Sequence, residues 1–111
     1  MALIDADKPI MPLSSVAEIL NAKLRTLRMY EDKGLLPNKE GKKLFSINDL
    51  RGIAFVHYLA SVKKVNAHGI RFIRELLDEH MDSIQKEKLL SSVEALIEGV
   101  SPKEFEEVET L

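Results

Sequence analysis

The chain has 111 residues, the size of one small domain or of one domain with a tail. It contains no cysteine, which excludes disulfides, thiolate metal sites and thiol redox chemistry. Aromatic residues make up only 5%, which favours helices over a sheet sandwich. No apolar run approaches the length of a membrane span, and the first residues lack the pattern of a targeting segment. The cytoplasm is the expected compartment, and no membrane partner is expected.

Charge is distributed unevenly along the chain, although the formal net charge is only −2. Residues 8–74 hold 13 Lys or Arg and 5 Asp or Glu, whereas residues 75–111 hold 3 Lys or Arg and 11 Asp or Glu. A basic front and an acidic back suggest a polyanionic partner for the front alone. Accidental clustering of the charges is the alternative.

The N-terminal part is predicted to be an extended arm followed by a short helix. Two prolines make a stable helix unfavourable within residues 1–12. Ser14 or Ser15 can cap the helix that follows, and Ser15 and Glu18 have capping-box spacing. This helix is expected to end near Asn21, because asparagine tolerates left-handed geometry.

A second helix is predicted over K-L-R-T-L-R-M-Y-E-D-K-G, from Lys23 to Gly34. Gly34 can adopt the left-handed conformation that ends a helix. Two short helices joined by so tight a turn form a helix-turn-helix, in which the second helix enters a DNA major groove. An ordinary surface helix, whose charges only maintain solubility, is the alternative. The predicted inward side carries Leu24, Leu27 and Glu31, and the predicted outward side carries Arg25, Met29 and Lys33, with Thr26 beside them and Arg28 near the boundary.

Residues 35–46 are predicted to form a small two-stranded ribbon around a turn. Its tip carries Lys39, Lys42 and Lys43. A basic hairpin beside a helix-turn-helix is a wing, which commonly contacts phosphate or the minor groove. The alternative is a lysine-bearing edge that discourages strand pairing.

Two further helices are expected to complete the domain. Ser46 and Asp49 have the spacing of a cap for a third helix, which runs to about Val62 and is rich enough in apolar residues to be central. Asn66 is expected to cap a fourth helix, which runs to about Leu77.

The chain after His80 is predicted to be helical to about Glu98 and to end at Gly99. Its apolar residues follow the spacing of a short coiled-coil seam for dimerisation. The alternative is a helix that folds back on its own core. A last helical turn begins at Ser101 with proline next in the chain. The predicted dimerisation residues are Leu89, Leu90, Val93, Leu96, Ile97 and Val100.

Three stretches closely resemble the MerR family of winged-helix transcription regulators: L-S-S-V-A-E-I-L-N-A, T-L-R-M-Y-E-D-K-G-L-L-P and F-S-I-N-D-L. The resemblance covers residues 13–77, and the D-K-P-I-M-P-L-S-S-V-A stretch adds a likeness to the heat-shock-repressor branch. It implies a mainly α fold, with a winged helix-turn-helix domain, a two-stranded wing and a C-terminal dimerisation helix. The expected organisation is an arm at 1–12, a DNA-binding domain at 13–79, and a dimerisation helix with an acidic tail at 80–111.

The resemblance also implies DNA contacts. Arg25, Thr26, Arg28 and Tyr30 match the family's recognition-helix contacts. In the wing, lysines replace the usual Tyr-Arg pair, and Phe45 matches the usual Tyr that follows. Lys replaces the usual capping Ser or Thr at the start of the recognition helix. The predicted DNA-binding residues are Lys23, Arg25, Thr26, Arg28, Tyr30, Lys39, Lys42 and Lys43.

The function implied is a regulator that binds a pseudo-palindromic promoter site as a homodimer and distorts the DNA. RNA polymerase or a co-regulator is a further possible protein partner. The alternatives are a DNA-bending, excisionase-like or architectural module, and a protein-interaction domain without DNA binding. No enzyme is expected, because no catalytic set is present. No cofactor or metal is expected, because His57, His68 and His80 are isolated and His57 is expected to be a packed side chain.

Overall fold

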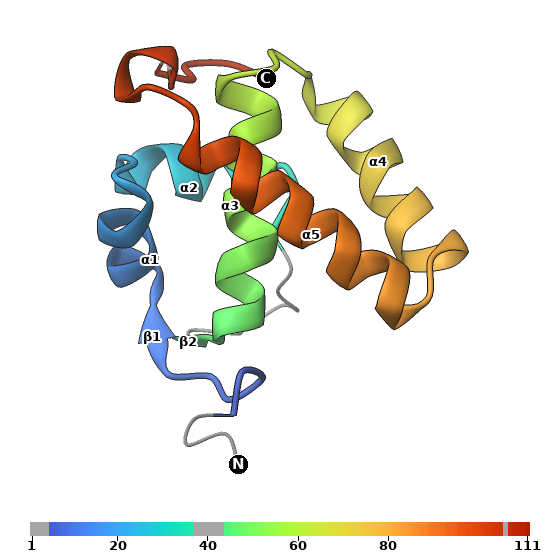
Figure 1. Cartoon of the computed structure of the whole chain (residues 1–111). Helices are drawn as coiled ribbons and strands as arrows, with labels where there is room; N and C mark the ends of the chain where they lie inside the picture. Colours follow the sequence, from blue (N-terminus) through green and yellow to red (C-terminus); the bar gives the residue numbers. More distant parts are fainter. Residues whose placement is uncertain (1–4, 37–43, 106) are drawn as a thin grey trace. The chain divides into compact units, whose positions relative to one another are not determined.

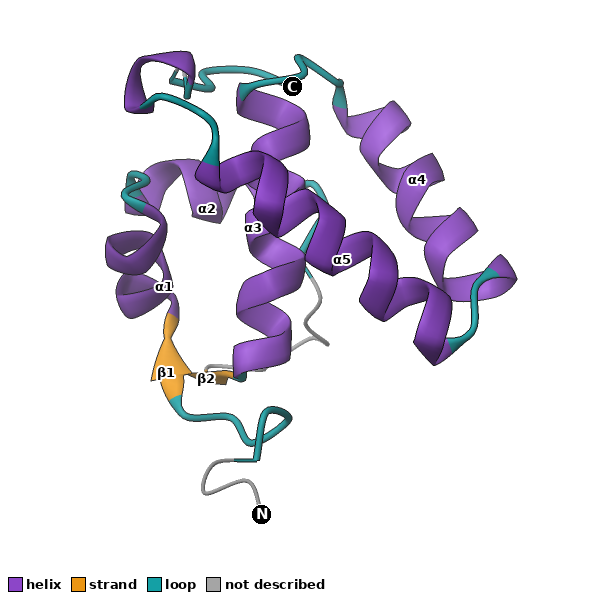
Figure 2. Ribbon diagram, viewed as in Figure 1, coloured by secondary structure: helices purple, strands orange, loops and turns teal. Residues whose placement is uncertain are grey.

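The computed structural model describes residues 5–36, 44–105 and 107–111. Over these ranges the chain is mainly α, as predicted, with five α-helices, one short antiparallel sheet and one 3-10 turn (Figures 1 and 2). The elements are β1 (Met11–Pro12), α1 (Leu13–Leu20), α2 (Leu24–Asp32), β2 (Leu44–Phe45), α3 (Ile47–Ser61), α4 (Ala67–His80), α5 (Ser83–Glu98) and the 3-10 turn η1 (Pro102–Glu104).

The chain divides into two compact units, Met1–Ala54 and Phe55–Leu111, and the division falls within α3. The domain boundary predicted between residues 79 and 80 therefore lies inside the second unit. Over the residues that the structure describes, no helix combines the length and the apolar character that crossing a membrane requires.

The first unit has a core shared by α1, α2 and the small sheet. α1 contacts α2 and both strands. Val16 of α1, Leu27 of α2 and Phe45 of β2 are almost completely buried. Burial of these apolar side chains is the main favourable term that holds so short a set of helices together.

The sheet differs from the predicted ribbon in its pairing partner. β2 pairs antiparallel with β1, so that Met11 lies opposite Phe45 and Pro12 lies opposite Leu44. Leu35, predicted to flank the turn of the ribbon, is buried but outside any strand. Its N–H donates to the Tyr30 carbonyl at 2.9 Å and so satisfies a carbonyl near the C-terminal end of α2. The predicted tip of the wing lies outside the described residues.

The pairing of β1 also moves the start of α1. The helix begins at Leu13 directly after the strand, Pro12 is the N-cap residue, and no side chain caps the helix. The predicted cap by Ser14 or Ser15 is therefore wrong, because the strand sets the helix start at Leu13, which precedes both serines. At the other end, Asn21 adopts φ 52° and ψ 40°, the left-handed geometry that the sequence predicted.

α3 has the predicted cap and the predicted central position. Asp49 N–H donates to Ser46 Oγ at 3.0 Å, and Ser46 N–H donates to Asp49 Oδ2 at 2.9 Å. This reciprocal pair satisfies two backbone donors at the helix start. From Phe55 to Ser61 every residue is buried, which is the pattern of a helix covered on all sides.

α4 begins where the sequence predicted and ends later. Asn66 Oδ1 accepts the N–H of Gly69 at 2.9 Å, which satisfies one of the first helical donors. A Cβ on Gly69 would lie 2.7 Å from Val65 Cγ1, so any larger residue there would force the Val65 side chain to shift. The helix continues to His80, three residues beyond the predicted Leu77.

α5 is capped by a reciprocal pair between Asp82 and Gln85. Its residues do not form a uniform outward seam: Val93 is only 6% exposed within a single chain, whereas Leu96 is 55% exposed. Val93 therefore packs inside its own chain and is not available as a dimer contact, which corrects its predicted role. Leu89, Leu90, Ile97 and Val100 are half-buried within the single chain, and their role in dimerisation stays a prediction.

Candidate nucleic-acid interface

The turn between α1 and α2 brings the two helices of a helix-turn-helix together in the first unit. Ala22 N–H donates to the Ala17 carbonyl at 2.9 Å, and Asn21 N–H donates to the Glu18 carbonyl at 3.1 Å. The left-handed conformation of Asn21 reverses the chain, so only Asn21, Ala22 and Lys23 separate the two helices. So short a connection fixes the direction of α2 relative to α1.

The end of α2 is also defined by local geometry. Gly34 adopts φ 71°, and its N–H donates to the Glu31 carbonyl at 3.0 Å. This closes the helix as the sequence predicted. Glu31, predicted to face inward, is half-buried. The C-terminal end of the short helix is thus closed by a backbone hydrogen bond that the left-handed Gly34 makes possible.

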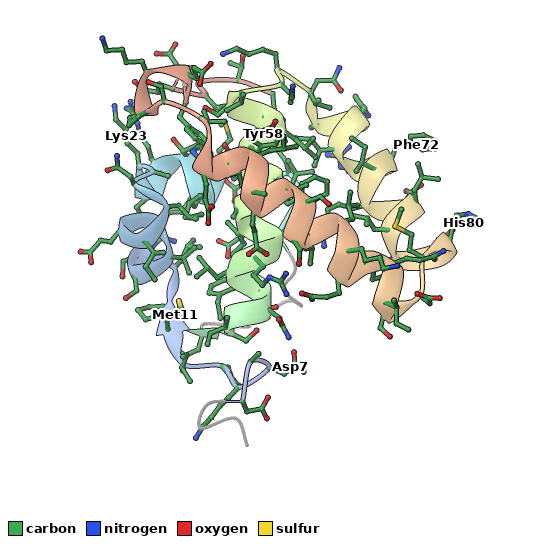
Figure 3. The ribbon with its side chains drawn as sticks, viewed as in Figure 1. Asp7, Met11, Lys23, Tyr58, Phe72 and His80 are labelled. Carbon is green, nitrogen blue, oxygen red and sulfur yellow. The ribbon has the colours of Figure 1, made fainter. Side chains whose placement is uncertain are left out.

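The outward side of α2 is basic. Lys23, Arg25, Arg28 and Lys33 are exposed, and Figure 3 shows Lys23 at the beginning of the helix. Lys23 is the N-cap residue and its side chain does not cap the helix. Arg25 lies in the first turn, near the end of the helix that meets base edges in helix-turn-helix proteins. A surface that carries these cations attracts a polyanion.

Thr26 and Tyr30, predicted to contact DNA, are instead buried. Thr26 is 5% exposed and Tyr30 is 0% exposed, so neither side chain can contact DNA in this conformation. Burial raises the pKa of the Tyr30 hydroxyl well above its ordinary value. The inward side of α2 is therefore Thr26, Leu27 and Tyr30, a stripe rotated from the predicted one.

The predicted wing lies only partly within the described residues. Lys39, Lys42 and Lys43 lie outside the described residues, and their roles stay predictions. Phe45, which occupies the place of the family's usual tyrosine, is 1% exposed and belongs to the core. Its position explains why the chain can use an apolar ring there.

The N-terminal arm makes a contact that sequence reasoning missed. Asn48 Nδ2 donates to Asp7 Oδ1 at 2.7 Å, and Asn48 N–H donates to the Ala6 carbonyl at 3.0 Å. The spacing of Asp5 and Asp7 before a proline signals a turn. No local signal identifies a partner 41 residues away.

His57 is packed, as the sequence predicted. Its ring stacks on Phe105 with centroids 5.5 Å apart and an interplanar angle of 19°. Burial lowers the pKa of its imidazole from the ordinary value. Among the residues that the structure describes, no group of three or more His, Asp or Glu side chains is placed to hold a metal ion.

Comparison with known proteins agrees with this architecture. The chain is similar to the crystal structure of the transcription regulator PbrR691 from Ralstonia metallidurans CH34 in complex with lead(II), with a TM-score of 0.56 and 20% identity, covering 81% of this chain and 73% of that chain. At this identity the likeness concerns the fold. A search of curated proteins found no match. The family model described as MerR helix-turn-helix family regulatory protein matches residues 11–77, which is more than half of the chain. The chain therefore belongs to the MerR family of helix-turn-helix regulatory proteins.

Proposed function

We propose that this chain is a transcription regulator that binds a pseudo-palindromic promoter site in double-stranded DNA as a homodimer and distorts the DNA. Membership of a regulatory family supports the role in transcription. The observation that carries the proposal is the division of α2 into a buried side and an exposed basic side. The buried side fixes the helix, and the basic side is left to meet DNA.

The two kinds of basic residue have different roles in this proposal. The planar guanidinium of Arg25 can grip a guanine edge with two hydrogen bonds, which discriminates between bases. An ammonium on a phosphate, as proposed for Lys42 and Lys43, adds affinity but reads no sequence. Lys23 and Arg28 flank Arg25 on the exposed side and are proposed to contact the backbone.

The test compares Arg25→Ala with Lys43→Ala on the operator and on a scrambled duplex across a salt series. Arg25→Ala should weaken specific binding by roughly 1–3 kcal/mol and leave non-specific binding much less affected. Lys43→Ala should weaken both alike and reduce the slope of log affinity against log salt by about one.

The opposite pattern would contradict this division of roles. If Arg25→Ala leaves the ratio of specific to non-specific affinity unchanged while Lys43→Ala abolishes it, the wing reads the sequence and α2 only positions the protein. Equal affinity of the unaltered protein for operator and scrambled duplex would reject sequence-specific recognition altogether.

Dimerisation is proposed to use the exposed part of α5. Leu96 offers an apolar contact at the surface of that helix. Lys86 and Lys88 lie in the first half of α5, whereas Glu94 and Glu98 lie in the second half. Glu87 also lies in the first half, and Lys86 pairs with Asp78 of its own chain at 3.6 Å, so Lys88 is the cation that an antiparallel second copy is proposed to place near Glu98.

Regulation is proposed to be independent of metal and of a small organic cofactor. PbrR691 is described in complex with lead(II), but this chain has no cysteine to supply thiolate ligands. Chelation should leave operator binding unchanged in a mobility-shift assay. Loss of binding after chelation, restored by one metal, would contradict the proposal.

The acidic C-terminal part is proposed to serve a protein partner. Residues 75–111 carry a large excess of carboxylates, which disfavours contact with DNA and suits a basic protein surface. RNA polymerase or a co-regulator is the partner class proposed, in the cytoplasm where promoter DNA is transcribed. No enzymatic role is proposed.

A further inference from the structure

The N-terminal arm is folded against the start of α3. Asp5 Oδ1 accepts the N–H of Asp7 at 2.9 Å, and the Asp5 carbonyl accepts the N–H of Lys8 at 3.1 Å. This turn presents the Asp7 carboxylate and the Ala6 carbonyl to Asn48 (Figure 3 labels Asp7). The two hydrogen bonds to Asn48, from its side chain to Asp7 and from its N–H to Ala6, are called the arm contact below.

The arm contact supplies hydrogen bonds that α3 needs. The first backbone donors of a helix have no partner within it. Ser46 Oγ satisfies the N–H of Asp49, and the Ala6 carbonyl satisfies the N–H of Asn48. The cap of α3 is thus divided between its own N-cap serine and the arm.

The same arm continues into the sheet. The N–H of Ile10 donates to the Phe45 carbonyl at 3.1 Å, and Met11 then pairs with Phe45. The arm is therefore hydrogen-bonded to β2 and, separately, to the first turn of α3. A sheet of two-residue strands is too short to be stable alone, so the second attachment helps to keep β1 on β2.

We infer that Asp7 and Asn48 are positioning residues for DNA binding, which rests on the function proposed above. In the sequence, Lys42 and Lys43 directly precede β2. By holding β1 on β2, the arm contact fixes the strand from which the basic segment departs. Neither Asp7 nor Asn48 needs to contact DNA for this effect.

The experiment measures operator affinity and amide exchange for four variants. Asp7→Ala and Asn48→Ala should each weaken operator binding by roughly twofold to threefold, because each removes the same solvent-exposed hydrogen bond. The double variant should be no weaker than the single ones, because both act on one interaction. Asp7→Asn should restore binding, since its amide oxygen can still accept from Asn48.

The matched control is Asp32→Ala, which removes an exposed carboxylate from α2. Charge alone predicts that losing a carboxylate strengthens binding to a polyanion. The inference predicts weaker binding for Asp7→Ala, so the two explanations differ in sign. If Asp7→Ala strengthens binding as Asp32→Ala does, the inference is overturned.

A readout without DNA separates this inference from the proposed function. The amide of Ile10 should exchange with solvent faster in Asp7→Ala and Asn48→Ala than in the unaltered protein, and at the original rate in Asp7→Asn. Unchanged exchange in Asp7→Ala overturns the inference. If the unaltered protein does not distinguish operator from scrambled duplex, the proposed function fails, and Ile10 exchange still decides whether the arm contact holds the sheet.

Discussion

Replacing Tyr30 with phenylalanine separates a packing residue from a DNA contact. Tyr30 is 0% exposed, and among the described residues no buried side-chain nitrogen or oxygen lacks a hydrogen-bond partner. Tyr30→Phe keeps the ring and removes the hydroxyl. The lost hydrogen bond should lower the free energy of unfolding by about 0.5–1.5 kcal/mol, and by up to about 3 kcal/mol if its partner stays buried and unsatisfied.

Arg25→Ala is the complementary variant on the same helix. Arg25 is exposed, so its loss should change the free energy of unfolding by no more than about 1 kcal/mol, the range of a surface interaction. Its proposed contact with a guanine edge is worth roughly 1–3 kcal/mol, which is a loss of about fivefold to more than a hundredfold in specific affinity. Tyr30→Phe should leave that affinity unchanged under conditions where the protein stays folded.

Two measurements on both variants decide between these roles. Urea unfolding followed by circular dichroism gives the free energy of unfolding, and fluorescence anisotropy with labelled duplexes gives the affinity for operator and scrambled DNA. A Tyr30→Phe protein that keeps its stability but loses specific affinity would refute the assignment of Tyr30 to the core. An Arg25→Ala protein that loses stability and keeps its specificity would refute the assignment of Arg25 to the DNA contact.

Two further outcomes follow from the structure. Val93→Asp should unfold the chain, because it places a charge at a site that is 6% exposed. Leu96→Asp should leave the circular dichroism spectrum intact and should give monomer by light scattering. A folded Val93→Asp protein would contradict the first prediction, and an unaltered protein that is already monomeric would contradict the second. Burial lowers the pKa of His57 in the folded state, whereas a histidine in the unfolded chain titrates near 6.5. The contribution of His57 to stability is therefore full above about pH 6.5 and decreases as the pH falls below that value. His57→Phe keeps an aromatic ring against Phe105 and should reduce this decrease between about pH 7 and 5.5; an unchanged pH profile would show that another group causes it.

Local signals in the sequence predicted several helix ends, but the capping-box spacing of Ser15 and Glu18 failed because β1 sets the start of α1. The Ser46 and Asp49 pair, the Asn66 cap and the left-handed Asn21 all occur as predicted, because each depends on residues within four positions. The positive φ of Gly34 follows the same rule. The family assignment was equally accessible, because its motif is contiguous.

Features that depend on residues far apart in the sequence could not be predicted from local signals. Met11 pairs with Phe45, 34 positions along the chain, and no local pattern selects that partner over Leu35. Periodicity alone also placed the inward side of α2 incorrectly: it favoured Glu31, whereas packing selects Thr26 and Tyr30. The buried side includes Leu27 and Tyr30, which are more apolar than Glu31, so spacing without the polarity of each residue was the weak point of the prediction.

The burial pattern of α5 also depends on packing that the spacing of its apolar residues does not reveal. The spacing of Val93 and Leu96 fits a seam between two copies, but the structure buries one and exposes the other. A repeat of this length cannot distinguish packing within a chain from packing between chains.

Genome-wide footprinting with the purified protein tests the central claim most directly, because it gives the binding sites and their surroundings in one measurement. The proposed function predicts two-fold symmetric protected sites within promoters, with enhanced cleavage at the centre where the DNA is distorted, and it predicts loss of those sites in Arg25→Ala. Protection without sequence preference, or sites confined to the attachment ends of mobile elements, would contradict the claim.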